Sequence, residues 1–188
     1  MAMGELVRAV AVPARQRRRI GGGELALGLA LTGGAVIASA LVSGLYSPSP
    51  GNRRIRRDYR RLDKPSFNPP DWVFGIWGPL FAALTVSGLR VWNAPRGTGR
   101  TRALAHWFGI QALNAIWMVI GFGWRRRGAM AAEAVVTVAN AAAYLDAARR
   151  VDRTAAWLAT PYLPWVAFAA LLSEELWRRN RDRPDVSP

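Results

Sequence analysis

Long uncharged apolar stretches, separated by short arginine-rich links, dominate this chain of 188 residues. Four of these stretches carry no charged residue: 25–46, 72–89, 103–124 and 154–173. A helix needs about 20 apolar residues to cross the roughly 30 Å hydrocarbon core of a bilayer. Three stretches reach or approach that length, and 72–89 reaches it when extended toward Trp92. The pattern therefore predicts membrane-spanning helices.

A further apolar segment, about 128–148, is weaker because it contains Glu133 near one end and Asp146 near the other. Arginine runs flank it on both sides, as is typical of membrane edges, and we predict that it also spans the membrane. Charged residues in spans are suspected of function by default. Both carboxylates lie close to segment ends and arginines, which favours snorkelling or ion pairing instead.

The links indicate how the spans are arranged. Most are short, so consecutive spans should be antiparallel neighbours in an all-α integral membrane bundle of five transmembrane helices. The link 47–71 is longer and contains five prolines, which cannot continue a helix. We expect it to form an ordered proline-rich loop over one mouth of the bundle. The expected organisation is a basic N-terminal tail (1–23), one five-helix membrane domain (24–180) and a C-terminal tail (181–188).

Composition excludes several other classes of protein. The chain has 26 Lys+Arg against 12 Asp+Glu, a net charge of +14, yet 51% of its residues are apolar. A nucleic-acid-binding protein would carry its cations along its helices, whereas here they are excluded from the apolar stretches, so we predict no nucleic-acid partner. The absence of Cys removes thiolate metal sites and cysteine nucleophiles. The single His, His106, rules out a site built on paired imidazoles.

The charges do not fix the membrane orientation. With five spans, 12 basic residues fall on one side and 14 on the other, so the positive-inside rule has no asymmetry to use. The run 15–19 followed by apolar residues and Ala38-Ser39-Ala40 could instead be a cleaved signal, but the uncharged run continues to Tyr46, longer than a usual signal core. A single Lys and abundant Ala indicate a GC-rich bacterial genome and hence a bacterial cell membrane.

Three motifs lie in order on these segments. They are YRRLDKPSFNPP at 59–70, LNAIW at 113–117 and PYLPWVAFA at 161–169. Together they resemble the tryptophan-rich sensory protein or translocator protein (TspO/MBR) family, over about residues 28–180. The resemblance implies a five-helix membrane bundle, often a homodimer, with a pocket between the helices under the loop that follows the first helix.

The resemblance also implies a ligand class. The family binds porphyrins and related tetrapyrroles such as protoporphyrin IX, so we expect an integral membrane receptor or sensor that regulates or scavenges heme-pathway intermediates. The tetrapyrrole would be the ligand, and no cofactor would be required. The alternatives are a membrane enzyme that degrades porphyrin with light and oxygen, or a tetrapyrrole transporter. Because the sequence shows no catalytic constellation, it favours binding over catalysis.

The chain departs from the family pattern at a few positions. Asp58 stands where the family has Trp, and Ser173 stands where it usually has Asn. Glu174 replaces the Tyr of sterol-binding members, so we do not expect a sterol partner. Glu133, in contrast, matches an acidic position common in the family's fourth helix.

A porphyrin is a flat apolar ring with two carboxylates at one edge, which suits aromatic walls with a few polar groups. Residues at helical spacing on the second, third and fifth segments could supply such walls, and the resemblance places ligand contacts at Trp77, Trp117 and Trp165. The predicted ligand-binding residues are Tyr59, Lys64, Trp77, Phe81, Asn114, Trp117, Trp165, Ala169 and Leu172.

Each of these residues has a plainer interpretation. The stripes could be helix packing, and Trp92, Trp124 and Trp177 at segment ends are typical of an interfacial belt. Asn114 could line the pocket or hydrogen-bond between helices. Lys64 could contact a ligand carboxylate, anchor the loop or be solvated. His106 could ligate heme iron, although a lone His at a helix end is more often solvated or packed.

Overall fold

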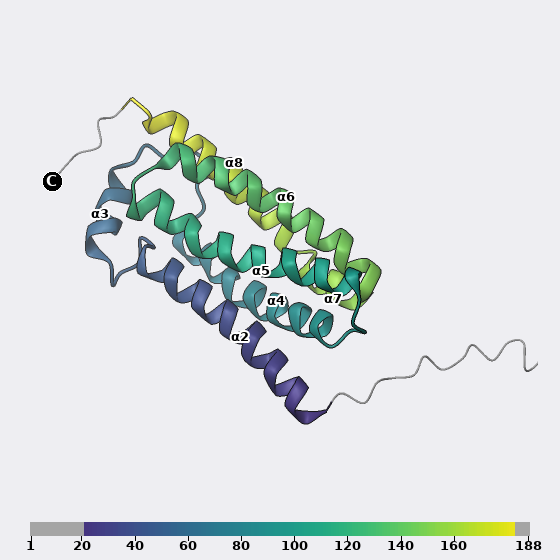
Figure 1. Cartoon of the computed structure of the whole chain (residues 1–188). Coiled ribbons are helices and arrows are strands. Elements are labelled where there is room, and N and C mark those ends of the chain that lie inside the picture. The colour runs from purple at the N-terminus through teal and green to yellow at the C-terminus, as the bar shows by residue number, and fades with distance from the viewer. Residues whose placement is uncertain (1–20, 183–188) are drawn as a thin grey trace, which may run out of the picture.

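The computed structural model describes residues 21–182, and every element within that range is a helix. The long helices form one elongated bundle (Figure 1): α2 (Gly22–Leu45), α4 (Trp77–Trp92), α5 (Thr98–Met118), α6 (Arg127–Val151) and α8 (Tyr162–Asn180). The shorter elements are α3 (Arg53–Arg61), η1 (Asp71–Ile76), η2 (Val119–Gly123) and α7 (Arg153–Ala159). The predicted tails 1–23 and 181–188 lie mostly outside the described residues.

Within the described residues, five helical stretches are long and apolar enough to cross a membrane: 22–45, 71–92, 98–123, 127–151 and 153–180. The predicted all-α bundle of five spans is confirmed, including the weaker span around Glu133. Many large apolar side chains of α2 point outward, such as Leu41 and Leu45. In water such a surface would be a liability, whereas in a bilayer it faces lipid.

The fifth span is broken rather than continuous. It consists of α7 and α8, which are interrupted at Thr160 and Pro161. Proline lacks the N–H that a helix interior needs, and its ring clashes with the carbonyl four residues earlier. Pro164 lies in the first turn of α8, where a backbone N–H would have no intrahelical partner, so it is tolerated there.

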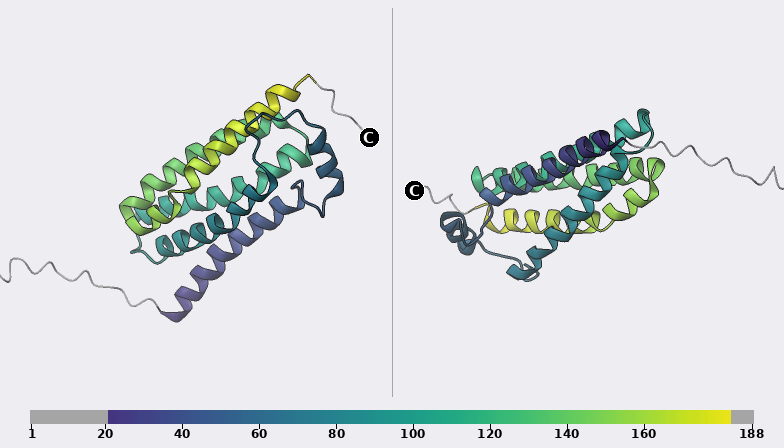
Figure 2. Two further views of the ribbon diagram at one scale, coloured as in Figure 1. Left: turned by 180° about the vertical axis from the view of Figure 1, so that it is seen from behind. Right: turned by 90° about the horizontal axis from the view of Figure 1, so that it is seen from below.

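The link between the first two spans contains a helix that the proline argument did not predict. The prolines occupy positions 48, 50, 65, 69 and 70, which leaves 51–64 free of them. The side chain of Asn52 caps the helix α3 by accepting a hydrogen bond from Ile55 N (3.4 Å). Figure 2 shows α3 and the segment after it crossing one end of the bundle, beside the C-terminal end of α8.

The opposite end of the bundle is tightly packed. The indole of Trp107 on α5 is fully buried and donates from Nε1 to Leu84 O on α4 (2.9 Å). Ser87 Oγ lies 2.5 Å from the Tyr144 hydroxyl and donates to Ala155 O (2.7 Å), which joins α4, α6 and α7. At this end of the bundle, the residues of the predicted aromatic stripes therefore serve helix packing.

Candidate functional site

A cavity of about 780 Å³ lies between the helix ends at the mouth where α3 crosses the bundle. Such a volume falls in the range of about 300–1,000 Å³ that is usual for small-molecule sites. Its helical walls consist of Ser43 and Gly44 (α2), Trp77 and Phe81 (α4), Asn114, Trp117 and Met118 (α5), Phe122 (η2), Met130 (α6), and Leu172, Ser173 and Leu176 (α8). The cover is formed by residues of the link: Ser47 to Pro50, Arg56, Tyr59, Arg60, Lys64 and Asn68 to Asp71.

The structure brings seven of the nine predicted ligand-binding residues together around this cavity. They are Tyr59, Lys64, Trp77, Phe81, Asn114, Trp117 and Leu172. Trp165 and Ala169 are not in the lining. Trp165 instead packs edge-on against Trp77, with ring centroids 5.8 Å apart, so it supports the wall from behind. The carbonyl of Ala169 accepts a hydrogen bond from Ser173 Oγ (2.7 Å).

Two hydrogen-bond donors that α5 contributes to the cavity lining have no partner in the part of the chain that the structure describes. Asn114 Oδ1 accepts from the Tyr162 hydroxyl (2.8 Å), but Asn114 Nδ2 donates to nothing. Trp117 Nε1 is also buried without an acceptor. A buried donor without a hydrogen bond costs about 1–3 kcal/mol, so an acceptor on a ligand in the cavity would recover that energy. Both interpretations of Asn114 therefore hold, because it bonds between helices and also lines the cavity.

The cover contributes cations and a tyrosine. Lys64 Nζ lies 4.8 Å from the centroid of the Tyr59 ring, and the Tyr59 hydroxyl donates to Asn68 Oδ1 (2.9 Å). Burial, and to a smaller extent the nearby Asp71 carboxylate, raise the pKa of Tyr59 above its ordinary value of 10.0. The hydroxyl therefore stays protonated at neutral pH. Arg56 and Arg60 add two further positive charges to the same side of the cavity.

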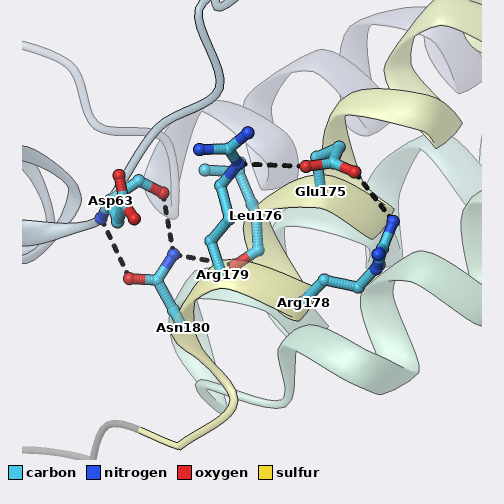
Figure 3. A network of polar contacts seen from close by, with 6 residues as sticks. All are labelled: Asp63, Glu175, Leu176, Arg178, Arg179 and Asn180. Carbon is cyan, nitrogen blue, oxygen red and sulfur yellow. Dashed lines mark hydrogen bonds and ion pairs between the residues drawn. The ribbon is translucent and has the colours of Figure 1, made fainter.

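Polar contacts on two sides help to fasten the cover to the bundle. Figure 3 shows the Asn180 amide at the end of α8 bonded to both backbone groups of Asp63, accepting from N (2.9 Å) and donating to O (2.9 Å). On the other side, Arg125 donates to Asp58 of α3 (3.0 Å). Arg125 adopts a left-handed backbone conformation (φ 56°), which costs about 1–2 kcal/mol in an L-residue. Asp58, which stands where the family has Trp, thus has an ion-pair partner in this chain.

The other ionisable residues that the sequence singled out within the spans do not line the cavity. His106 Nδ1 bonds Asn140 Oδ1 (2.9 Å) and is not in the cavity lining. Asp146 is ion-paired with Arg149 and Arg150, as expected. Glu133 accepts from Thr137 Oγ1 (2.8 Å) rather than from an arginine. Within residues 21–182 no group of three or more His, Asp or Glu side chains is arranged to hold a metal ion.

The sequence analysis missed several lining residues. Phe122 packs edge-on against Tyr59 (5.8 Å), but it belongs to the wider turn η2, where ordinary helical spacing does not predict its direction. Met130 is neither polar nor aromatic, so nothing in the sequence marked it as a lining residue. Arg56 and Arg60 follow the same four-residue spacing as Lys64, and that spacing was the available signal.

The sequence model of the TspO/MBR family matches residues 34–178, which is most of the chain. The chain belongs to the TspO/MBR family. A translocator protein of Ovis aries is 36% identical over 147 residues, covering 72% of this chain and 87% of that protein. A tryptophan-rich sensory protein of Cereibacter sphaeroides is 34% identical over 129 residues, covering 68% and 80% respectively. The tryptophan-rich protein TspO of Chlorobaculum tepidum is 30% identical over 156 residues, covering 82% and 96%.

Family membership and the five apolar spans together make this chain an integral membrane protein. The family match includes α3 and all the residues that line the cavity. Bacterial proteins are among its relatives, in agreement with the predicted location in a bacterial membrane. The names of these relatives describe translocation and sensing and do not specify a ligand.

Proposed function

We propose that this protein is a membrane receptor or sensor that binds porphyrins and related tetrapyrroles in the cavity under the proline-rich link. The main support is the distribution of groups around one cavity. Aromatic side chains form the deep walls, and three cations lie on the cover. A flat apolar ring with carboxylates at one edge matches that distribution better than a uniformly apolar or uniformly charged ligand would.

The orientation of the ligand follows from the same arrangement. The ring would lie among Trp77, Phe81 and Trp117, while its carboxylates point toward Arg56, Arg60 and Lys64. Asn114 Nδ2 and Trp117 Nε1 would donate to acceptors on the ligand. Charge-assisted bonds from guanidinium groups to carboxylates are among the stronger hydrogen bonds available to a protein.

Titration of the purified protein with protoporphyrin IX in detergent tests this proposal. Binding should quench tryptophan fluorescence, because several indoles line or adjoin the cavity. The Asn114→Ala variant should bind about fivefold more weakly, as expected for one lost hydrogen bond of about 1 kcal/mol. The dimethyl ester of protoporphyrin, which lacks the carboxylate charges, should also bind more weakly than the free acid.

Asn140→Ala is the matched control. Asn140 is also an amide within the bundle, but it bonds His106 and does not line the cavity. It should keep the affinity of the wild type. Thermal unfolding of both variants separates lost binding from lost fold, since Asn114→Ala also leaves the Tyr162 hydroxyl without its acceptor. Equal affinities in the wild type and the Asn114→Ala variant would remove this residue from the site.

Degradation and transport are tested with the same material. Under illumination in air, porphyrin absorbance with the protein should fall no faster than that of free porphyrin in detergent; a faster fall would favour the enzyme alternative. Flux across reconstituted vesicles would favour a transporter.

We further propose that the protein acts as a homodimer. We also propose that it does not use a sterol as its ligand, since exposed Glu174 replaces the Tyr of sterol-binding members.

A further inference from the structure

The helix α3 has two different faces. Ile55, Arg56 and Tyr59 are half-buried on the side toward the bundle, and Arg56 and Tyr59 reach the cavity. Arg53, Arg54 and Arg57 are exposed on the outer side. Residues four apart in a helix share a face, so Arg53 and Arg57 lie in one row with Arg54 beside them. The binding site explains the inner face and leaves the outer one without a role.

The arginines at the other end of the bundle are mostly engaged, in contrast to these three. Arg90 pairs with Asp152, Arg96 pairs with Glu24, and Arg100 lies over the Trp92 ring. For Arg53, Arg54 and Arg57, no carboxylate partner exists within residues 21–182. Three exposed guanidinium groups on one short helix repel one another, and an external anion would relieve that repulsion.

The position of α3 indicates where that anion comes from. The helix begins shortly after α2 ends, and its Asp58 bonds Arg125, the neighbour of Trp124. Trp124 is 59% exposed at the end of a span, as expected for a residue at the level of the lipid headgroups. The outer face of α3 therefore lies at the membrane surface, where the phosphate groups of phospholipids are the nearby anions.

We infer that the outer face of α3, formed by Arg53, Arg54 and Arg57, binds the phosphate groups of anionic phospholipids. The planar guanidinium group donates two parallel hydrogen bonds to a phosphate, which a neutral side chain cannot do. A basic residue near an anionic bilayer contributes about 1 kcal/mol, and three of them on one face act together. Lipid binding would also hold α3, and with it the cover, against the membrane surface.

Native mass spectrometry of the full chain in detergent tests this inference. Phosphatidylglycerol and phosphatidylcholine with the same acyl chains are added in turn, and retained lipids are counted. The wild type should retain more phosphatidylglycerol than phosphatidylcholine. The variant R53Q/R54Q/R57Q should lose at least about tenfold of its phosphatidylglycerol affinity, since each arginine is worth about fivefold, with little change for phosphatidylcholine.

The variant R102Q/R149Q/R153Q is the matched control. It also removes three exposed arginines, but from the opposite end of the bundle, and it leaves Arg150 to pair with Asp146. It should keep the lipid preference of the wild type. An equal loss in both variants, or none in the α3 variant, would overturn the inference. Displacement of phosphatidylglycerol by an excess of inorganic phosphate would also overturn it, because the face would then be a simple anion site.

Two further measurements keep the test decisive. Protoporphyrin titration of the α3 variant reports whether the cavity is intact, so lipid binding and tetrapyrrole binding can fail separately. If that variant does not fold, the wild type still gives an answer, since its preference for phosphatidylglycerol should weaken as salt is raised. A preference that does not respond to salt would contradict an electrostatic origin.

Discussion

The side-chain amide of Asn180 makes three hydrogen bonds, of which two reach the backbone of Asp63 and one reaches Leu176 O (2.8 Å). Asn180 is almost fully buried, so these bonds are shielded from water. Few side chains could replace it, because the contact needs a donor and an acceptor side by side. This residue therefore couples the end of the last helix to the cover of the cavity.

Replacing Asn180 with Leu should loosen the cover. Two lost hydrogen bonds of about 1 kcal/mol each would raise the open population of the cover by up to about thirtyfold. The arginine-rich α3 should then be cut faster by trypsin, and bound porphyrin should dissociate faster. Limited proteolysis followed by mass analysis locates the cuts, and stopped-flow fluorescence gives the dissociation rate.

Glu175→Gln serves as the control for this prediction. Glu175 lies on the same stretch of α8 and bonds Arg178 and Arg179 on the exposed surface, as Figure 3 shows. Exposed ion pairs of this kind contribute about 0–1 kcal/mol, so the cover should stay closed. If trypsin cuts the wild type and the Asn180→Leu variant at the same rate, Asn180 does not hold the cover.

The sequence predicted individual residues well where a motif fixed their place, and less well where packing decided it. Trp77 and Trp117 line the cavity as predicted, while Trp165 lies behind Trp77. All three have the same chemistry and similar helical spacing. Only the neighbour opposite each ring decides whether it faces a cavity or another indole, and the sequence of one helix does not contain that information.

Among the helices, α4 shows how one stripe can serve two purposes. Trp77 and Phe81 face the cavity, whereas Leu84 and Gly88 are buried against α5. Gly88 has the indole of Trp107 directly against it, so the two helices approach closely at that point. A small residue there is a condition for the packed end of the bundle.

Gly88→Ala should therefore destabilise the protein. The added Cβ would lie about 2.7 Å from Trp107 Nε1, and that indole cannot move freely because it is buried and bonded to Leu84 O. Overpacking of this kind costs about 1–3 kcal/mol. Thermal unfolding in detergent should show a lower midpoint than that of the wild type.

Gly78→Ala in the same helix provides the comparison. A Cβ at Gly78 would meet nothing within 4 Å, so the better helix propensity of Ala should leave stability unchanged or raise it by up to about 1 kcal/mol. If both variants unfold at the same temperature, the close approach at Gly88 is not a determinant of stability.

The uncharged stretches located the five spans but not all of their ends, since α5 begins at Thr98 and α8 ends at Asn180. The rule that proline breaks helices correctly placed irregular backbone around positions 65–70, but it hid α3, which occupies the proline-free part of the link. The same rule explains the break at Pro161 and the tolerance of Pro164 one turn later. A proline count alone could not separate these cases, because position within the turn decides the outcome.

At the scale of the whole molecule, the bundle is filled at one end and hollow at the other. Trp107 and Tyr144 fill the end near α7, and the cavity occupies the end under α3. The number of spans and the covering link were predictable from charge and apolar length. The cavity at the other end was not predictable, because it depends on how five separate helices are spaced there. The periodicity within each helix contains no information on that spacing.

The central claim is that a tetrapyrrole occupies the cavity under the link, and the absence of cysteine allows a direct test of it. In the Met118→Cys variant a unique thiol lines the cavity, and in Thr98→Cys a unique thiol is exposed at the far end. With protoporphyrin IX at about ten times its Kd, modification by a small methanethiosulfonate reagent should slow about tenfold in the first variant and not in the second. Unchanged modification of the Met118→Cys variant, while tryptophan quenching reports bound porphyrin, would place the ligand elsewhere and contradict the account.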